Sequence, residues 1–432
     1  MRRLSAIGAA HLGSLASVTD GIHESLPFIE DGPVKVLSAK HPKDNFIDTT
    51  EYETIAQDYH NKNPRTQLRT GDVLLSTVGT IGNAAVVTKD ILPANSDRHI
   101  GIIRPKSDSL SPYYLAAFLV GRYGRTQTLR EATGNVQLNL FISKIDRLLL
   151  PRFSSAFESR IASEVASAYA MRKSAYHSIA SAEQSLLMAL GLTNWQPPQP
   201  LSYARSSRDV FATGRLDAEY FAPLVAELLQ YLRKGNRKIG DVAPARHERF
   251  TPAAGVFNYI EIGGVRADGT ALSETLEQSE APSRATWHVH GGDIITSTVR
   301  PARRLSALIA PEQSGDVCSS GFVVLEPKHI APEVLLTYLR LPPVCELLDL
   351  HTSASLYPTI SEQDLLNIPF PNIDAPTAVK VAEAVRAAQA MRQQAAQLLE
   401  AAKRAVEIAI EDSESAALAF MKSMRPGLAT QW

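Results

Sequence analysis

The sequence contains one long alanine-rich stretch twice. Residues 161–189 return as residues 381–409, and both copies carry the triplet Ala-Met-Arg, at 170–172 and at 390–392. Steps of alternately four and three residues connect small and apolar side chains along each copy, which is the a/d pattern of a coiled coil. Two equivalent helices in one chain pack most economically antiparallel, because a pseudo-twofold axis then relates the segments they carry.

The segments that precede the two helices repeat as well, which makes the chain a duplication of one module. The first copy contains RTGDVLLSTV where the second contains HGGDIITSTV. The matched pairs are residues 69–78 with 290–299, 100–105 with 320–327, 111–115 with 331–335, and 142–148 with 360–366. Their order and spacing agree in the two copies, so we expect both copies to fold alike.

The pattern within each module predicts a mixture of strands and helices. Residues 73–78 and 294–299 each follow Gly-Asp as apolar runs, which is typical of a turn into a buried strand. Residues 112–123 and 332–341 begin with proline, which favours the first turn of a helix. Because the strands lie close together in the sequence, the expected fold class is α+β, with two similar mixed modules separated by an antiparallel two-helix coiled coil of pseudo-twofold symmetry.

These patterns define the expected organisation along the chain. A proline-rich connector at 195–200 follows the first helix, and an amphipathic stretch at 224–232 leads into the second module. The tail shows no clear periodicity. The boundaries are residues 1–152 for the first module, 153–192 for the first long helix, 193–373 for the linker and second module, 374–412 for the second long helix, and 413–432 for the C-terminal tail.

Composition restricts the classes of protein that the chain can belong to. With 432 residues, 44% of them hydrophobic, the chain can form several packed cores. No apolar run approaches the roughly 20 residues that span a bilayer, so we expect no membrane association. The start resembles a signal peptide only superficially, and we interpret it as mature protein. Two cysteines, Cys318 and Cys345, cannot form a disulfide framework, which favours a cytoplasmic location.

Signatures of common enzymes are absent from the sequence. It has no Gly-rich dinucleotide or phosphate-binding motif, no nucleophile elbow and no zinc-protease motif, so we expect no catalytic residues. His288 and His290 alternate along one strand near Asp293, but they lack a third ligand at a fixed spacing. We therefore expect neither a metal site nor a cofactor bound by this chain.

Basic and amide side chains in the loops are candidates for DNA contact. The net charge of −1 argues against a binder driven by charge alone. Arginine can nevertheless pair with guanine O6 and N7, and Asn or Gln with adenine N6 and N7. The alternatives are a solvated basic face and amides that bind nearby backbone. The candidate DNA-binding residues are Arg122, Arg125, Arg130, Asn135, Gln137 and Asn139 in the first module, and Arg300, Arg303, Arg304, His351, Thr352 and Tyr357 in the second.

One arginine lies near the middle of each long helix, Arg172 in the first and Arg392 in the second. Antiparallel helices centred there bring the two guanidinium groups together. One interpretation is that both side chains extend along the helices into solvent. The other is that they bind carboxylates of a partner subunit.

Together these residues resemble the DNA specificity subunit of type I restriction-modification enzymes, over essentially the whole chain. The resemblance rests on the Gly-Asp-apolar-Ser-Thr-Val element with Gly-Thr-Ile-Gly at 79–82, the stretch Gly-Asn-Val-Gln-Leu-Asn at 134–139, the proline that ends each module, the long helices, and residues 215–223.

The resemblance implies two target-recognition domains, each reading one half of a split double-stranded DNA site. The helices would act as a spacer and as the docking surface for two methyltransferase subunits. The chain itself would be non-catalytic. Methyl transfer from S-adenosylmethionine would belong to those partners, and ATP- and Mg-dependent cleavage to restriction or translocase subunits where these exist.

The second module departs from the first in its loops, where Gly-Thr-Ile-Gly at 79–82 becomes Arg-Pro-Ala-Arg at 300–303. Such divergence between matched strands is expected if the modules read different DNA sequences. An alternative function is a coiled-coil scaffold whose modules bind proteins and not DNA. A third is an enzyme whose site carries no familiar motif.

Overall fold

The structure is a computed structural model that describes residues 2–107, 109–193, 195, 200–353 and 357–424. Its contacts divide the chain into two compact units. Unit 1 comprises residues 1–173 and 391–432, and unit 2 comprises residues 174–390. Each unit contains one module and one half of each long helix. Both units combine helices with mainly antiparallel sheets, which confirms the α+β prediction.

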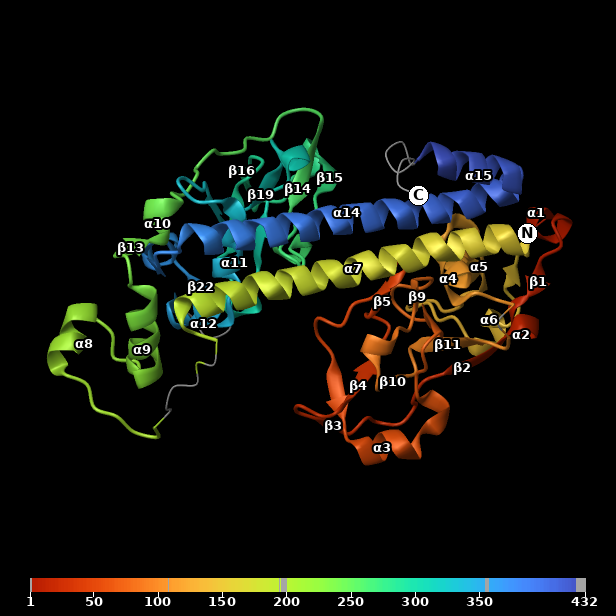
Figure 1. Cartoon of the computed structure of the whole chain (residues 1–432), viewed down its shortest axis with the longest axis horizontal. Helices are drawn as coiled ribbons and strands as arrows, with labels where there is room; N and C mark the ends of the chain where they lie inside the picture. The colour runs from red at the N-terminus through yellow and green to blue at the C-terminus, as the bar shows by residue number, and fades with distance from the viewer. Residues whose placement is uncertain (1, 108, 194, 196–199, 354–356, 425–432) are drawn as a thin grey trace. The chain divides into compact units, whose positions relative to one another are not determined.

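The framework of unit 1 is a sheet of four antiparallel strands covered by a helix. The strands lie in the order β2 (Ala16–Asp20), β11 (Ile100–Pro105), β8 (Val73–Ser76) and β9 (Ala84–Val86). Helix α4 (Pro112–Val120) packs on β8 and β9, and seven of its nine residues are buried. Figure 1 shows α4 next to β9. The proline of α4 occupies the first turn, where a helix does not need the missing N–H.

Unit 1 has a second sheet of four strands with a small core of its own. Its order is β10 (Ala94–Ser96), β4 (Val34–Leu37), β7 (Glu53–Ile55) and β3 (Phe28–Ile29), and β10 runs parallel to β4. Val34, Val36 and Ile55 form its buried cluster. Helix α3 (Gln57–Lys62) adjoins this sheet, since Tyr59 packs on its buried cluster. The hairpin of β5 (Pro42–Lys43) and β6 (Phe46–Ile47) packs on the framework strands β8 and β9.

Unit 2 repeats this design. The framework strands lie in the order β18 (Ser306–Leu308), β17 (Ile294–Ser297) and β20 (Phe322–Leu325), with helix α11 (Pro332–Leu339) on β17 and β18. The second sheet has the order β15 (Glu274–Glu277), β14 (Val256–Ile260), β19 (Val317–Ser319) and β16 (Ala285–His288). It also contains one parallel pair, β14 with β19, so the two sheets of each unit correspond in kind.

Short elements close each unit in the same way. The strand near the start of each module pairs with the strand at its end, β1 with β12 and β13 with β23. The bounds in unit 1 are α1 (Arg2–Ala6), β1 (Ala10–His11), α2 (Leu12–Leu15), α6 (Ile142–Ile145) and β12 (Leu149–Leu150). Those in unit 2 are β13 (Arg237–Lys238), α10 (Ile239–Val242), α13 (Glu362–Asn367) and β23 (Pro369–Phe370).

The turn before each central strand repeats down to single hydrogen bonds. Gly71 and Gly292 adopt positive φ angles of 89° and 93°. The carboxylates of Asp72 and Asp293 each accept a backbone N–H from the residue three positions earlier, at 2.8 Å in both units. The duplication seen in the sequence is therefore a duplication of structure, because the same glycine conformation and the same aspartate bond recur.

Two long helices lie within the ranges 153–192 and 374–412 expected from the sequence, and both divide between the units. They are α7 (Ser155–Leu190) and α14 (Ala375–Glu411). The core of unit 1 combines Val165 of α7 with Val406 of α14, and the core of unit 2 combines Leu186 with Val385. Each unit thus pairs opposite halves of the two helices, which is the pairing that antiparallel helices make. None of the described helices combines the length and the apolar character needed to cross a bilayer.

Two regions differ from the sequence-based expectation. The tail is not aperiodic, because residues Glu414–Ser423 form helix α15, whose Ser413 caps the N-terminus and whose Ala417 and Met421 join the core of unit 1. The connector contains α8 (Ser207–Thr213) before the expected helix α9 (Pro223–Leu232). Residues 196–199 and 425–432, on which parts of these predictions fall, lie outside the described residues.

Candidate nucleic-acid interface

Three loops of unit 1 meet at Thr77, which follows strand β8. The backbone N–H of Thr77 donates to the carbonyl of His99 at 3.1 Å. Its own carbonyl accepts the N–H of Leu140 at 2.9 Å, and the next residue, Val78, pairs with Asn139. The loops at 77–83, 97–99 and 133–139 are therefore fixed side by side, and we call this arrangement the Thr77 junction.

Unit 2 builds the same arrangement around Thr298, after strand β17. The N–H of Thr298 donates to the carbonyl of Gly321 at 2.8 Å, and its carbonyl accepts the N–H of Ile360 at 2.9 Å. The next residue, Val299, pairs with Thr359. We call this the Thr298 junction. Loops at corresponding positions meet at both junctions, but they carry different side chains.

The 133–139 hairpin places two of the predicted amides in solvent. Thr133 and Asn139 exchange backbone hydrogen bonds of 2.9 and 2.8 Å, which close the hairpin. Asn135 and Gln137 are exposed on either side of Val136, whose side chain is fully exposed. Asn139 has an internal role, because its side-chain amide donates to the carbonyl of Gln137 at 3.1 Å. Asn135 and Gln137 are thus the amides best placed to contact a ligand.

The three arginines predicted in unit 1 lie on helix α5 (Arg122–Glu131). The expected single helix over 112–123 is wrong, because Gly121 adopts an extended conformation that separates α4 from α5. Arg125 donates to Asp44 and to Asn83, so its guanidinium stabilises the loop after β8. The Arg122 side chain is 73% exposed and lies 3.6 Å from Glu411. Arg130 is exposed, with no recorded side-chain partner among the described residues.

The three arginines predicted in unit 2 have different surroundings. The guanidinium of Arg304 forms an ion pair with Glu183 of α7, so it is engaged within the unit. Arg303 is exposed. The backbone N–H of Arg300 donates to the carbonyl of Pro358 at 2.9 Å, and its guanidinium carbon lies 5.3 Å from the centre of the Tyr357 ring. The structure therefore brings Arg300 and Tyr357 together, although 57 positions separate them in the sequence (357 − 300).

A buried arginine holds the end of the loop that follows β17 through hydrogen bonds to backbone carbonyls. Arg340, which is 5% exposed, donates to the carbonyls of Arg304 at 2.6 Å and Ser306 at 3.0 Å, and also to that of Ala267. Burial away from water lowers the pKa of Arg340 to about 10. The end of the loop at residues 304–306 is therefore held by a buried side chain of the same unit.

His351 and Thr352 lie at the base of the second hairpin, between helix α12 (Pro342–Leu350) and β21 (Thr352–Ser353), which pairs with β22 (Thr359–Ile360). The ring of His351 packs edge to face on Tyr220 at 5.6 Å, and burial lowers its pKa. The hydroxyl of Thr352 donates to the carbonyl of Asp349 at 2.7 Å. Residues 354–356 of this hairpin lie outside the described residues.

Sequence reasoning did not identify the loop before the last framework strand, which is β11 in unit 1 and β20 in unit 2. In unit 1 this loop is 97–99, in which Arg98 is exposed and the imidazole of His99 binds Asp97 at 2.8 Å. In unit 2 it is 319–321, where the N–H of Ser320 donates to the carbonyl of Arg284. The sequence does contain a sign of this loop, because in both units it comes directly before the matched segments 100–105 and 320–327.

The remaining candidates lie outside the junctions. The guanidinium carbon of Arg172 lies 3.7 Å from the centre of the Phe46 ring, and Arg172 and Arg392 are both half-buried. His290 binds Glu248 at 2.7 Å, and His288 lies 3.2 Å from the carbonyl of Gly315. Within the described ranges, no group of three or more His, Cys, Asp or Glu side chains is arranged to hold a metal ion.

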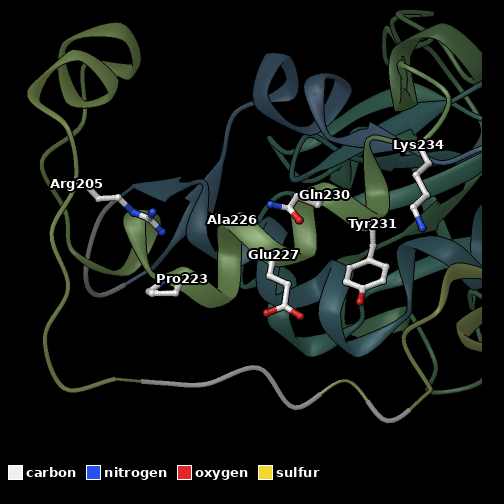
Figure 2. A pocket seen from close by; sticks show the side chains of 7 residues that line it. All are labelled: Arg205, Pro223, Ala226, Glu227, Gln230, Tyr231 and Lys234. Atoms are coloured by element: carbon white, nitrogen blue, oxygen red, sulfur yellow. The ribbon is translucent and has the colours of Figure 1, made fainter.

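A pocket of about 550 Å³ lies along helix α9 in unit 2. Figure 2 shows Arg205 and Lys234 at opposite ends of the row of lining residues, with the carboxylate of Glu227 between them. Lys234 also lies 5.0 Å from the centre of the Tyr231 ring. The lining residues belong to α9 and the connector and are not shared with the Thr298 junction, so the pocket is separate from the candidate interface.

The chain consists of two similar α+β units, each of which contains one half of each long helix. Comparison with solved structures finds chains that align with this one over nearly their whole length. The S subunit of a type I restriction-modification system from M. genitalium aligns over 98% of this chain and 96% of its own, with 12% identity and a TM-score of 0.38. The HsdS subunit from Thermoanaerobacter tengcongensis aligns over 97% and 96%, with 15% identity and a TM-score of 0.29.

A third chain comes from a structural study of complex assembly and conformational transition in a type I restriction-modification system. It aligns over 97% of both chains, with 16% identity and a TM-score of 0.29. No protein-family model matches the sequence. No curated protein matches it either.

Proposed function

We propose that the chain is a sequence-specific DNA-recognition subunit that reads a bipartite double-stranded site, one half with each unit. The observation that supports this proposal is the recurrence of one loop arrangement, as the Thr77 junction in unit 1 and the Thr298 junction in unit 2. Thr77 and Thr298 gather corresponding loops by equivalent hydrogen bonds, while the side chains on those loops differ. A conserved framework with variable loops suits two readers of unlike sequences, because specificity comes from contacts to base edges and not from the fold.

The chain supplies recognition, and its partners supply chemistry. The proposed partners are two methyltransferase subunits that use S-adenosylmethionine, with restriction or translocase subunits that use ATP and Mg²⁺ where a nuclease exists. With a net charge of −1, the chain requires phosphate contacts from these partners, because nonspecific affinity for DNA depends on neutralised phosphates. Helix α7, with 36 residues and a length of about 54 Å at ~1.5 Å per residue, sets the spacing of the half-sites in this proposal.

Selection of DNA from a randomised pool tests this function. The complex of this chain with its methyltransferase subunits is expected to enrich duplexes with two specified blocks of bases separated by an unspecified spacer of constant length. The complex without this chain is the control and should enrich no such pattern. Enrichment of a single continuous site would contradict the two-reader proposal.

A protein-binding scaffold is the competing function. It predicts normal assembly with partner proteins and no sequence preference in the selected DNA. The purified chain alone, incubated with Mg²⁺ and duplex DNA, distinguishes the third possibility, because a nuclease would cleave without partners. We expect no cleavage in that assay.

The docking of partners is proposed to use the middle of the long helices. Arg172 and Arg392 occupy the same register in α7 and α14 and are half-buried. The double variant Arg172→Ala/Arg392→Ala is expected to reduce co-purification with the methyltransferase subunits at least tenfold, as loss of charge-assisted bonds to carboxylates predicts. Lys380→Ala, an exposed substitution on α14, is the matched control. A double variant that assembles normally removes this assignment.

A further inference from the structure

The loop after the central strand has an unusual backbone in unit 2. In unit 1 the two positions with positive φ are glycines, Gly79 at 70° and Gly82 at 91°. In unit 2 the positions with positive φ are Arg300 at 50°, which aligns with Gly79, and Arg304 at 59°. The loop of unit 2 is one residue longer, so the strand register places Arg304, and not Arg303, opposite Gly82. A side chain disfavours this left-handed conformation, which glycine adopts freely. Two arginines in one loop therefore adopt a backbone conformation that usually requires glycine, and other contacts must stabilise each of them.

Arg304 is explained by contacts within unit 2. Its guanidinium pairs with Glu183, and its carbonyl accepts a bond from the buried Arg340. These bonds hold the strained residue in place, because the surrounding structure determines its conformation. Arg304 is thus part of the framework, and its side chain is directed to α7.

Arg300 has no such explanation among the described residues. No carboxylate in the described ranges forms an ion pair with its guanidinium, whose carbon lies over the Tyr357 ring at 5.3 Å from the ring centre. The Tyr357 side chain is itself 61% exposed. The backbone bond from Arg300 to Pro358 fixes the base of the side chain at the Thr298 junction. A strained backbone, a fixed base and an aromatic support together orient one guanidinium at the surface of the junction.

We propose that Arg300, supported by Tyr357, recognises a guanine in the half-site read by unit 2. This inference rests on the proposed function and names the base that one residue reads. A guanidinium held over an aromatic ring by a cation-π contact has no ion-pair partner there, so its N–H groups can form the fork that matches the O6 and N7 acceptors of guanine. A phosphate contact requires only positive charge, which the exposed Arg303 beside it supplies without any strain.

The main test uses Arg300→Gly, which restores the residue that unit 1 has at this position. The variant relieves the strained backbone, so its folding is expected to be at least as stable as that of the parent chain. In complex with the methyltransferase subunits it should lose about 5- to 150-fold in preference for guanine at one position of one half-site. Selection from a randomised DNA pool measures this loss. The other half-site should be unchanged.

Two further variants make the result decisive. Arg300→Lys keeps the charge but lacks the fork, so it should lose the guanine preference while retaining the salt dependence of binding. Arg303→Ala is the matched control and should weaken binding to all sequences alike. The inference is overturned if Arg300→Gly selects the parent site with uniformly weaker binding. It is overturned together with the proposed function if the parent complex selects no sequence.

Discussion

Replacing residues 134–138 by Asn-Gly is expected to abolish base preference in one half of the bound DNA site and to leave the other half intact. The segment projects from the Thr77 junction with Asn135, Val136 and Gln137 exposed. Thr133 and Asn139 already exchange two backbone hydrogen bonds, and Asn-Gly is the preferred two-residue connection for such a pair. Each amide that reads an adenine contributes about 1–3 kcal/mol of discrimination, so losing both removes most selectivity.

The stability of unit 1 should change by less than about 1 kcal/mol, because the deleted residues belong to the exposed class and only Leu138, at 44% exposed, covers some apolar surface. Leu140, which is 2% exposed, stays anchored to Thr77 through its N–H. The double variant Asn135→Ala/Gln137→Ala keeps the loop length and isolates the amides. Leu129→Ala, a half-exposed substitution on α5, is the control. Loss of preference in both halves of the site would contradict independent reading by the two units.

Removing the aspartate of either repeated turn is expected to destabilise only the unit that contains it. The carboxylate of Asp72, which is 1% exposed, accepts the N–H of Arg69 and two bonds of 2.7 Å from Arg104. The carboxylate of Asp293 accepts bonds of 3.0 and 3.2 Å from Arg246. Removing one partner of a buried ion pair costs about 3–5 kcal/mol. Because each arginine is about a quarter exposed, we expect the lower end, about 3 kcal/mol.

Hydrogen exchange resolved by peptide measures this effect for each unit. Asp72→Ala should increase exchange in β8 and β11, and Asp293→Ala should do so in β17 and β20. Glu30→Ala and Glu280→Ala change exposed carboxylates in the same units and should shift stability by less than about 0.5 kcal/mol. An equal loosening of both units by either aspartate variant would show that the units do not open separately.

The long helices and the framework strands could be predicted from the sequence because their signals are local. Heptad periodicity over residues 161–189 and 381–409 located α7 and α14, and a Gly-Asp turn before an apolar run located β8 and β17. Helix α15 was missed because it is short and only Ala417 and Met421 mark its buried face. Over ten residues, two buried positions do not establish a helical period.

The junctions could not be predicted in the same way, because they depend on hydrogen bonds between distant parts of the chain. The sequence offers Arg300 and Tyr357 as two independent candidates for DNA contact. Only the fold shows that the guanidinium of Arg300 lies over the Tyr357 ring. Arg304 was grouped with Arg300, but its partner Glu183 lies 121 positions away on α7. The left-handed backbone of Arg300 had no local signal either, since the residues that usually adopt it are glycine and asparagine.

The division of the long helices has a consequence for how the protein is made. Unit 2 is one continuous segment, residues 174–390, whereas unit 1 needs residues 391–432 in addition to its first 173. Val406 and Met421 belong to its core, beside Val165. On the ribosome, the half of the protein that is synthesised first is therefore the half that is completed last. Until residues 391–424 are synthesised, the apolar residues of unit 1 that pack against them stay uncovered, and exposed apolar surface of this kind makes a partly folded chain prone to aggregation.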